Sequence, residues 1–199
     1  MHWRSPVGNL GMPDISDSKV LVRPAVLEDA ECLSALAFRS KAYWGYSHDF
    51  MEACREELHY TQADIGSKGF LFAIAELSRT IVGFYAIKAL SDNQFELEAL
   101  FVEPAYIGQG IGRMLIEHAK QTAKKLGGDR LVIQSDPHAV GFYQAVGGVS
   151  IGDRESASIS DRLLPMFAIP LHENITVTDG HSYELPSIHS LNRVTGTPQ

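Results

Sequence analysis

Residues 97–113 read LEALFVEPAYIGQGIGR, and this stretch joins a strand-like segment to the start of a helix. Glycine follows Pro104 at alternate positions, as Gly108, Gly110 and Gly112. The first N–H groups of a helix have no partner inside it, and the helix dipole favours negative charge there. Because glycines let a phosphate approach those N–H groups, the stretch predicts a pyrophosphate-binding loop. The alternative is that the glycines only form a tight turn between a strand and a helix.

Two common phosphate-binding patterns do not fit this loop. The dinucleotide pattern GxGxxG fails because Arg113 and Leu115 stand where its last glycine would be. The chain also lacks the Gly-Lys pair, followed by Ser or Thr, that a nucleotide P-loop requires. In addition, the loop follows the fourth predicted strand, whereas a dinucleotide loop follows the first. The ligand is therefore expected to belong to another class.

The segments around the loop show either the period of a strand or that of a helix. We predict strands at residues 19–23, 70–77, 81–88, 95–102, 131–134, 149–153 and 164–171, and helices at 27–39, 47–60, 110–126 and 139–145. This order is typical of an α+β, or mixed α/β, domain. We expect its strands to be antiparallel early in the chain and to cross over through a helix later.

Composition places the chain among ordinary globular proteins. It has 199 residues, 45% of them hydrophobic, which suggests one domain of moderate size. We expect a flexible leader over residues 1–18, one domain over 19–171 and a tail of uncertain structure over 172–199. The formal net charge of -7 argues against a partner that is nucleic acid or an anionic membrane surface.

Cysteine usage and hydropathy indicate the compartment. Only Cys32 and Cys54 are present, too few for a disulfide framework and without the CxxC spacing of a zinc or redox site. No run of about 18 apolar residues occurs, and the N-terminal stretch has no signal-like segment. We therefore expect a cytoplasmic protein without a membrane partner. The eight histidines form no HExxH or clustered pattern, so we expect no metal.

A second segment, residues 135–143, reads SDPHAVGFY and is followed by Gly147 and Gly148. Together with the glycine loop it resembles the GNAT acetyltransferase superfamily, in which the loop binds acetyl-CoA and the second segment flanks the pantetheine and the thioester. The family loop begins with Arg or Gln three residues before its first fixed glycine, and Ile107 stands at that position here. Asp136 stands where Asn is frequent, which removes an amide donor to pantetheine.

The resemblance, which covers about residues 19–171, implies a GNAT-like fold, with a central mixed, mostly antiparallel sheet of about six to seven strands flanked by about four helices. It also implies acetyl-CoA as co-substrate, held mainly by main-chain groups. On this basis the residues assigned to acetyl-CoA are Leu100, Val102, Ile107, Gly108, Gln109, Gly110, Ile111, Gly112, Arg113, Asp136, Ala139 and Phe142. The N–H of Leu100 or Val102 is the implied donor to the thioester oxygen, provided that a bulge splays their strand from its neighbour. Arg113 fits a solvated helix face equally well.

Acetyl transfer to an amine requires a group that accepts the proton of the ammonium. A lysine-like amine has a pKa of about 10.4, so at neutral pH a carboxylate must accept its proton, directly or through water. Glu96 and Glu98 are the candidates, because they lie two apart on one strand, on the face expected for Leu100 and Val102. We predict that Glu98 is the base, since it is nearer to Val102. The alternative is that both glutamates only face solvent.

Transfer also requires a donor that protonates the leaving thiolate, and Tyr143 is the predicted acid. Its ordinary pKa of about 10 lets it protonate a thiolate whose pKa is about 8.5. The resemblance favours this role, because the second motif of the family places a tyrosine beside the thioester. The alternative is that Tyr143 packs in the core beside Phe142.

Few residues indicate the acceptor. Tyr43, Trp44 and Tyr46 lie between the first two predicted helices, where the family commonly lines its substrate slot, and aromatic walls suit an apolar body or a cation. They suit the packing of the two helices equally well. Arg162 lies in a polar loop between the last strands and can hold a substrate carboxylate in a bidentate pair. Its alternative is a solvated surface arginine.

The sequence thus predicts an acetyl-CoA-dependent N-acetyltransferase whose partner is a small-molecule amine, with a homodimer as a possible assembly. One alternative is a module that binds acetyl-CoA for regulation or interaction, without turnover. Another is acetylation of a protein N-terminus or lysine, which needs a groove open at both ends.

Overall fold

The computed structural model describes residues 19–172 of the chain. The predicted leader lies outside the described residues, and so does the predicted tail apart from His172. The elements follow the predicted order closely. They are β1 (Leu21–Pro24), α1 (Ala30–Ala42), α2 (His48–Ala53), α3 (Gln62–Ile65), β2 (Phe70–Leu77), β3 (Thr80–Ala89), β4 (Gln94–Val102), α4 (Ile111–Lys125), β5 (Arg130–Gln134), α5 (Val140–Ala145), β6 (Val149–Glu155) and β7 (Leu163–Pro170), with short 3-10 turns η1 (Leu27–Asp29), η2 (Pro104–Tyr106) and η3 (Pro137–Ala139).

The seven strands form one sheet in the order β1-β2-β3-β4-β5-β7-β6. All neighbours are antiparallel except β4 and β5, which are parallel and joined through α4. The predicted mixed, mostly antiparallel sheet is therefore confirmed. The described residues contain five α-helices rather than about four, because the helix predicted over 47–60 ends at Ala53 and α3 follows separately.

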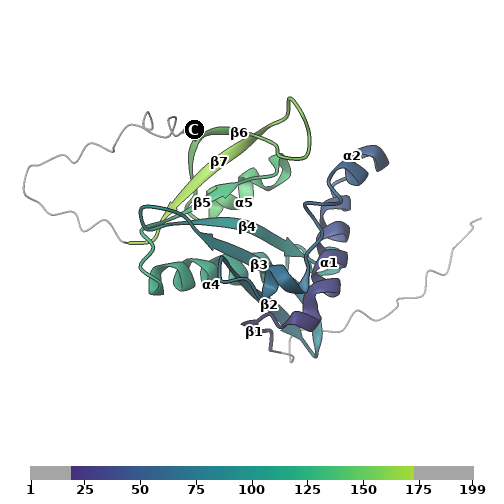
Figure 1. The fold of residues 1–199 in the computed structure, drawn as a ribbon, viewed down its shortest axis with the longest axis horizontal. Helices are drawn as coiled ribbons and strands as arrows, with labels where there is room; N and C mark the ends of the chain where they lie inside the picture. Colours follow the sequence, from purple (N-terminus) through teal and green to yellow (C-terminus); the bar gives the residue numbers. More distant parts are fainter. Residues whose placement is uncertain (1–18, 173–199) are drawn as a thin grey trace, which may run out of the picture.

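Helices cover both faces of the sheet, with α1 and α4 on opposite sides (Figure 1). Alternate residues of β3 point into two separate hydrophobic clusters, as the period of a strand requires. Tyr85 and Ile87 lie in the cluster beside α4 and α5, whereas Phe84 and Ala86 lie in the cluster beside α1 and α2. The central strands, such as β3, are thus buried on both faces, and a site among them must open at an edge or at a break in the sheet.

A β-bulge provides such a break in β4. Ala86 of β3 pairs with Ala99, but the next residue, Ile87, pairs with Leu97, so Glu98 has no partner in this ladder. The extra residue bends the strand and increases its local twist. The bulge that the family resemblance implies is therefore present, and Glu98 lies at it.

The bulge also changes which side chains of β4 share a face. Leu97, Leu100 and Val102 all pack with the cluster beside α4, although Leu97 and Leu100 are three residues apart. Strict alternation is therefore broken between them, and Glu96, next to Leu97, lies on the other face. The prediction that Glu96 and Glu98 share a face with Leu100 and Val102 is wrong, because it assumes an unbroken strand.

β4 and β5 pair over a short stretch only. Residues 94–97 pair with residues 130–133, yet β4 continues to Val102. Within the described part of the chain, β4 beyond Leu97 therefore lacks a strand partner on its β5 side. Main-chain N–H and C=O groups left unpaired in this way are available to a ligand.

Candidate active site

A cavity of about 600 Å³ opens along the part of β4 that has left β5. Its walls come from β4, the loop before α4, the segment between β5 and α5, the end of α1 and the turn between β6 and β7. The cavity brings together most of the predicted site residues: Glu96, Glu98, Tyr143, Leu100, Val102, Ile107, Gly108, Gly110, Gly112, Arg113, Asp136, Ala139, Phe142, Trp44 and Arg162. Four others, Tyr43, Tyr46, Gln109 and Ile111, do not line it.

The loop before α4 has the backbone geometry of an anion site. Gly108 and Gly110 have φ angles of +82° and +87°, a left-handed conformation that favours glycine. A Cβ on either residue would have open space around it, so the backbone there is not covered by other protein atoms. Gly110 caps α4, and its carbonyl accepts a hydrogen bond from the N–H of Met114. The N–H groups of the first turn are therefore available to a phosphate.

Two predicted loop residues have side chains with structural roles. Gln109 donates from Nε2 to the carbonyl of Ala105 at 2.8 Å, and Ile111 is buried in the cluster beneath α4. The prediction for these two residues therefore extends at most to their main chain. Gly112 differs from them, because a Cβ there would lie in van der Waals contact, 3.4 Å from the ring of Phe142, so the side of α4 at Gly112 packs against α5.

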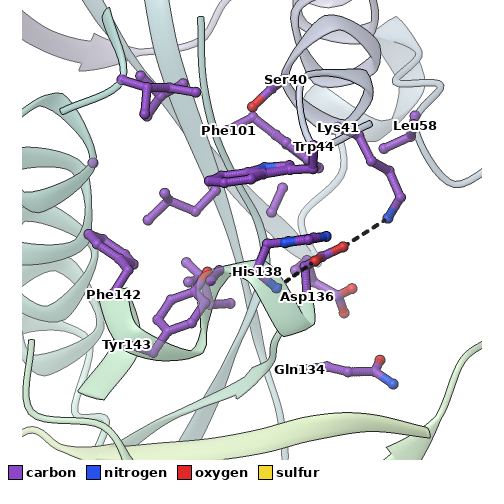
Figure 2. Close-up of a pocket in the computed structure, with 18 of the residues that line it drawn as sticks. Ser40, Lys41, Trp44, Leu58, Phe101, Gln134, Asp136, His138, Phe142 and Tyr143 are labelled. Atoms are coloured by element: carbon purple, nitrogen blue, oxygen red, sulfur yellow. Dashed lines mark hydrogen bonds and ion pairs between the residues drawn. The ribbon is translucent and has the colours of Figure 1, made fainter. Parts of the chain in front are cut away.

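Tyr143 lies on α5 at the floor of the cavity (Figure 2). It is only 7% exposed, with its ring against Phe142 and Phe167. Burial, reinforced by the nearby charge of Asp136, raises the pKa of its hydroxyl well above the ordinary value. The phenol is therefore protonated across the physiological pH range. Tyr143 is thus both a core residue and a cavity residue, and the two interpretations of the sequence are compatible.

The two glutamates of β4 differ in their ion pairs. Glu96 is paired with Arg154, and its side chain is 14% exposed. The Glu98 side chain is 34% exposed, and its Oε1 lies 3.6 Å from the Nζ of Lys88. Burial and repulsion from Glu96 raise the pKa of Glu98. Lys88 opposes this rise without cancelling it. Glu98 is therefore the more weakly paired carboxylate, and it is more basic than an ordinary glutamate.

Asp136 connects several elements at the other end of the cavity. The hydroxyl of Tyr46 donates to its carboxylate at 2.8 Å, and the N–H of His138 donates at 3.0 Å, which caps η3. The Nζ of Lys41 lies 4.0 Å away and the Nη2 of Arg162 lies 3.6 Å away (Figure 2 shows the Lys41 and His138 contacts). The carboxylate that replaces the frequent asparagine thus orders cations and hydroxyls around it.

The predicted aromatic wall is only partly in the cavity. Trp44 stacks on His138 with 5.2 Å between ring centroids and 7° between ring planes, and both rings line the cavity (Figure 2). Tyr43 is 55% exposed and packs edge-on against Trp44 outside the lining. Tyr46 stacks on Phe50 at 4.1 Å, which is the packing role considered above, although its hydroxyl also reaches Asp136.

Several polar residues that the sequence analysis did not single out also line the cavity, among them Lys41, Glu57 and His138. Lys41 pairs with Glu57 at 3.1 Å, and His138 lies in the second motif between Asp136 and Ala139. His138 had a signal, because its neighbours in the motif were assigned to acetyl-CoA. Lys41 and Glu57 had none, because they come from segments whose meeting depends on the tertiary fold.

Metal-binding and membrane-spanning features are not found in residues 19–172. No three His, Cys, Asp or Glu side chains in that range are grouped as they would be around a metal ion. No helix in the same range is both long and apolar enough to span a bilayer.

Comparisons with known proteins agree with this geometry. The chain is 33% identical over 127 residues to the peptidyl-lysine N-acetyltransferase YjaB of Salmonella typhimurium, an alignment that covers 63% of this chain and 81% of the relative. The corresponding protein of Escherichia coli is 31% identical over 129 residues, with 64% and 81% covered. Among solved structures, the PaiA N-acetyltransferase of Thermoplasma acidophilum in complex with coenzyme A shares the fold, with a TM-score of 0.65 and 22% identity over 76% of this chain and 99% of that one.

A family model settles the assignment. The model for the acetyltransferase (GNAT) family matches residues 38–147, which include the glycine loop, both β4 glutamates and Tyr143. The match spans more than half of the 199 residues, and the resemblance based on two short motifs is confirmed. The chain belongs to the GNAT family of acetyltransferases.

Proposed function

We propose that this acetyltransferase transfers the acetyl group of acetyl-CoA to a primary amine by direct attack of the amine on the thioester. The observation that carries the proposal is the content of one cavity. It holds an exposed helix N-terminus, a protonated tyrosine and a carboxylate with a raised pKa. These are an anion site, an acid and a base, the three groups that acetyl transfer to an ammonium requires.

In this proposal the loop from Ile107 to Arg113 binds the pyrophosphate of acetyl-CoA through main-chain N–H groups. The positive φ angles of Gly108 and Gly110 support it, because they expose the first turn of α4 without a covering side chain. The unpaired side of β4 binds the pantetheine arm and offers the N–H of Leu100 or Val102 to the thioester oxygen. Such a donor stabilises the oxyanion that forms when the amine attacks.

Each proton that moves in the proposed reaction has a donor and an acceptor. Glu98, directly or through water, accepts a proton from the acceptor ammonium and leaves a neutral nitrogen. The nitrogen forms a bond to the acetyl carbon while the carbon–sulfur bond breaks, and it then releases a second proton to solvent, which leaves a neutral amide. Tyr143 donates its proton to the departing thiolate, and its raised pKa favours rapid recovery of that proton from solvent. The products are an amide and free coenzyme A thiol.

Glu98→Gln is expected to lower kcat/KM at neutral pH and to remove an ionisation from the acid limb of its pH profile. The base acts only when deprotonated, so activity falls as pH drops through its pKa. Since the pKa of Glu98 is raised, this fall occurs at higher pH than for an ordinary glutamate. The measurement is kcat/KM against pH with a primary amine that the parent protein acetylates.

Glu96→Gln is the matched control, because it removes an equivalent carboxylate two residues away that is already paired with Arg154. It is expected to retain the acid limb, moved to lower pH because the repulsion that helps to raise the pKa of Glu98 is lost. If the two variants exchange these profiles, Glu96 is the base. If both titrate like the parent protein, neither carboxylate accepts the proton.

The acceptor we propose is a small molecule, and peptidyl-lysine is the second candidate. The relatives from Salmonella typhimurium and Escherichia coli, which are peptidyl-lysine N-acetyltransferases by name, favour the second. Both acceptors present the same primary amine, so the chemistry at Glu98 and Tyr143 is unchanged. The cytoplasmic location and the homodimer stay predictions.

Release of free thiol from acetyl-CoA tests the proposal. The expected result is release that depends on an added primary amine, from a set that contains small amines and a lysine peptide. If acetyl-CoA binds but no amine in either class causes release, the chain is a binding module and the proposed function is wrong.

A further inference from the structure

Arg162 is held in the cavity by aromatic rings and by one of its two terminal nitrogens. Its guanidinium carbon lies 4.7 Å from the ring centre of Phe50 and 5.3 Å from that of Tyr46. Its Nη2 donates to the hydroxyl of Tyr46 at 2.9 Å and lies 3.6 Å from Asp136. The side chain is 18% exposed, so it is not the solvated surface arginine of the alternative interpretation.

The turn that carries Arg162 is also fixed. The N–H of Ser156 donates to the Arg162 carbonyl at 2.7 Å, and the N–H of Ile159 donates to the Ser156 hydroxyl at 3.3 Å. Across this turn, Ser158 donates from its hydroxyl to Glu57, which is itself paired with Lys41. A guanidinium on a fixed turn, held over two rings, loses little freedom when it binds an anion.

The donors of Arg162 are only partly used. Among the described residues, its hydrogen bond and its ion pair both involve Nη2, while Nε and Nη1 have no hydrogen-bond acceptor within the described chain. A guanidinium presents its donors in a planar fork that matches the two oxygens of a carboxylate. Arg162 lines the cavity. Nε and Nη1 lie on different edges of the guanidinium, so a bidentate carboxylate uses Nη1 together with the second hydrogen of Nη2, which the bond to Tyr46 leaves unused.

Two further carboxylates lie on another wall of the same cavity. Glu96 and Glu98 lie on β4, whereas Arg162 lies on the turn between β6 and β7. In the mechanism proposed above, Glu98 receives the acceptor ammonium. An acceptor with an ammonium at one end and a carboxylate at the other therefore matches both walls.

We infer that the preferred acceptor is a small amino acid-like zwitterion, whose carboxylate binds Arg162 while its amine faces Glu98. The inference rests on the proposed function and narrows its substrate class. Tyr46 and Asp136 hold the guanidinium in this arrangement. A lysine inside a peptide lacks the carboxylate and does not use this part of the cavity.

Matched pairs of acceptors test the inference. The probes are 4-aminobutanoate, 5-aminopentanoate, 6-aminohexanoate and L-lysine, each compared with its own carboxamide. Each pair presents the same amine chain and differs in the carboxylate. We expect at least one acid to have a kcat/KM about 10- to 100-fold above that of its amide, the range for a hydrogen-bonded charge pair.

In Arg162→Gln, the kcat/KM values for the acid and the amide of that pair are expected to lie within about twofold of each other, with acetyl-CoA affinity unchanged. Arg162→Lys keeps the charge without the fork and is expected to restore part of the preference. Arg55→Gln is the control, since Arg55 pairs with Glu52 on the surface and does not line the cavity. Arg55→Gln should keep the full kcat/KM preference for the acid over its amide.

Equal rates for acids and amides in the parent protein would overturn the inference, and so would a preference that persists in Arg162→Gln. Either result leaves acetyl transfer itself intact, because the amides and a lysine peptide still release thiol. Absence of thiol release from every amine contradicts the proposed function instead, so the two failures are distinguishable.

Discussion

Tyr143→Phe is expected to lower kcat by about 10²- to 10⁴-fold, the usual effect of a positioned general acid. The substitution keeps the ring, which packs against Phe142 and Phe167, and removes only the hydroxyl. Acetyl-CoA affinity is therefore expected to stay within about twofold of the parent value. The measurements are kcat from thiol release under conditions in which chemistry limits the rate, and affinity from calorimetry.

Tyr43→Phe is the control for this variant. Tyr43 is more than half exposed and lies outside the cavity lining, so loss of its hydroxyl should leave kcat unchanged. A parental kcat in Tyr143→Phe would remove Tyr143 from the mechanism. A large loss in Tyr43→Phe would instead restore the predicted substrate role that the structure does not support.

Gly110→Asp is expected to weaken acetyl-CoA binding by about 100-fold or more, because it brings a carboxylate to the proposed pyrophosphate site at the start of α4. Gly110 has a φ of +87°, so any side chain there also strains the backbone. Strain alone must therefore be separated from loss of the anion site. The measurement is the dissociation constant for acetyl-CoA.

Gly127→Asp supplies the matched control. Gly127 follows the other end of α4, has a φ of +86° and, like Gly110, has open space where a Cβ would be. It does not line the cavity. Equal stability losses in the two variants, with binding lost only in Gly110→Asp, would support the anion site. Unchanged affinity in a folded Gly110→Asp protein would contradict it.

The order of strands and helices could be predicted from the sequence, because each element carries its own periodic pattern and its own boundaries. The glycine loop and the Tyr143 segment could also be predicted, since each is a short continuous motif. The bulge at Glu98 was implied by the family but had no local pattern of its own. An unbroken strand would place Glu96 and Glu98 on the face of Leu100 and Val102, and the bulge makes that expectation wrong.

The contacts around the acceptor end could not be predicted in the same way. Asp136, Tyr46, Lys41, Glu57 and Arg162 come from five segments and meet only after the sheet has formed. A charged residue in a loop looks the same in sequence whether it is solvated or held against two rings. The burial of the Arg162 side chain, rather than its identity, distinguishes these two cases.

Direct transfer also requires that no residue of the protein carries the acetyl group. Both cysteines lie outside the cavity lining, and burial raises the pKa of the Cys54 thiol, which disfavours the nucleophilic thiolate. The cavity therefore favours attack by the acceptor amine itself. An acetyl-cysteine intermediate would require a thiol in another place.

A single-turnover experiment tests the central claim most directly. The protein, in excess over acetyl-CoA, is mixed with an amine that supports thiol release, and the masses of protein and amine are followed over time. Direct transfer predicts one acetylated amine for each thiol released, with the protein mass unchanged at every time point. An acetylated protein that forms before the product, and decays as the product appears, would contradict direct attack in this cavity.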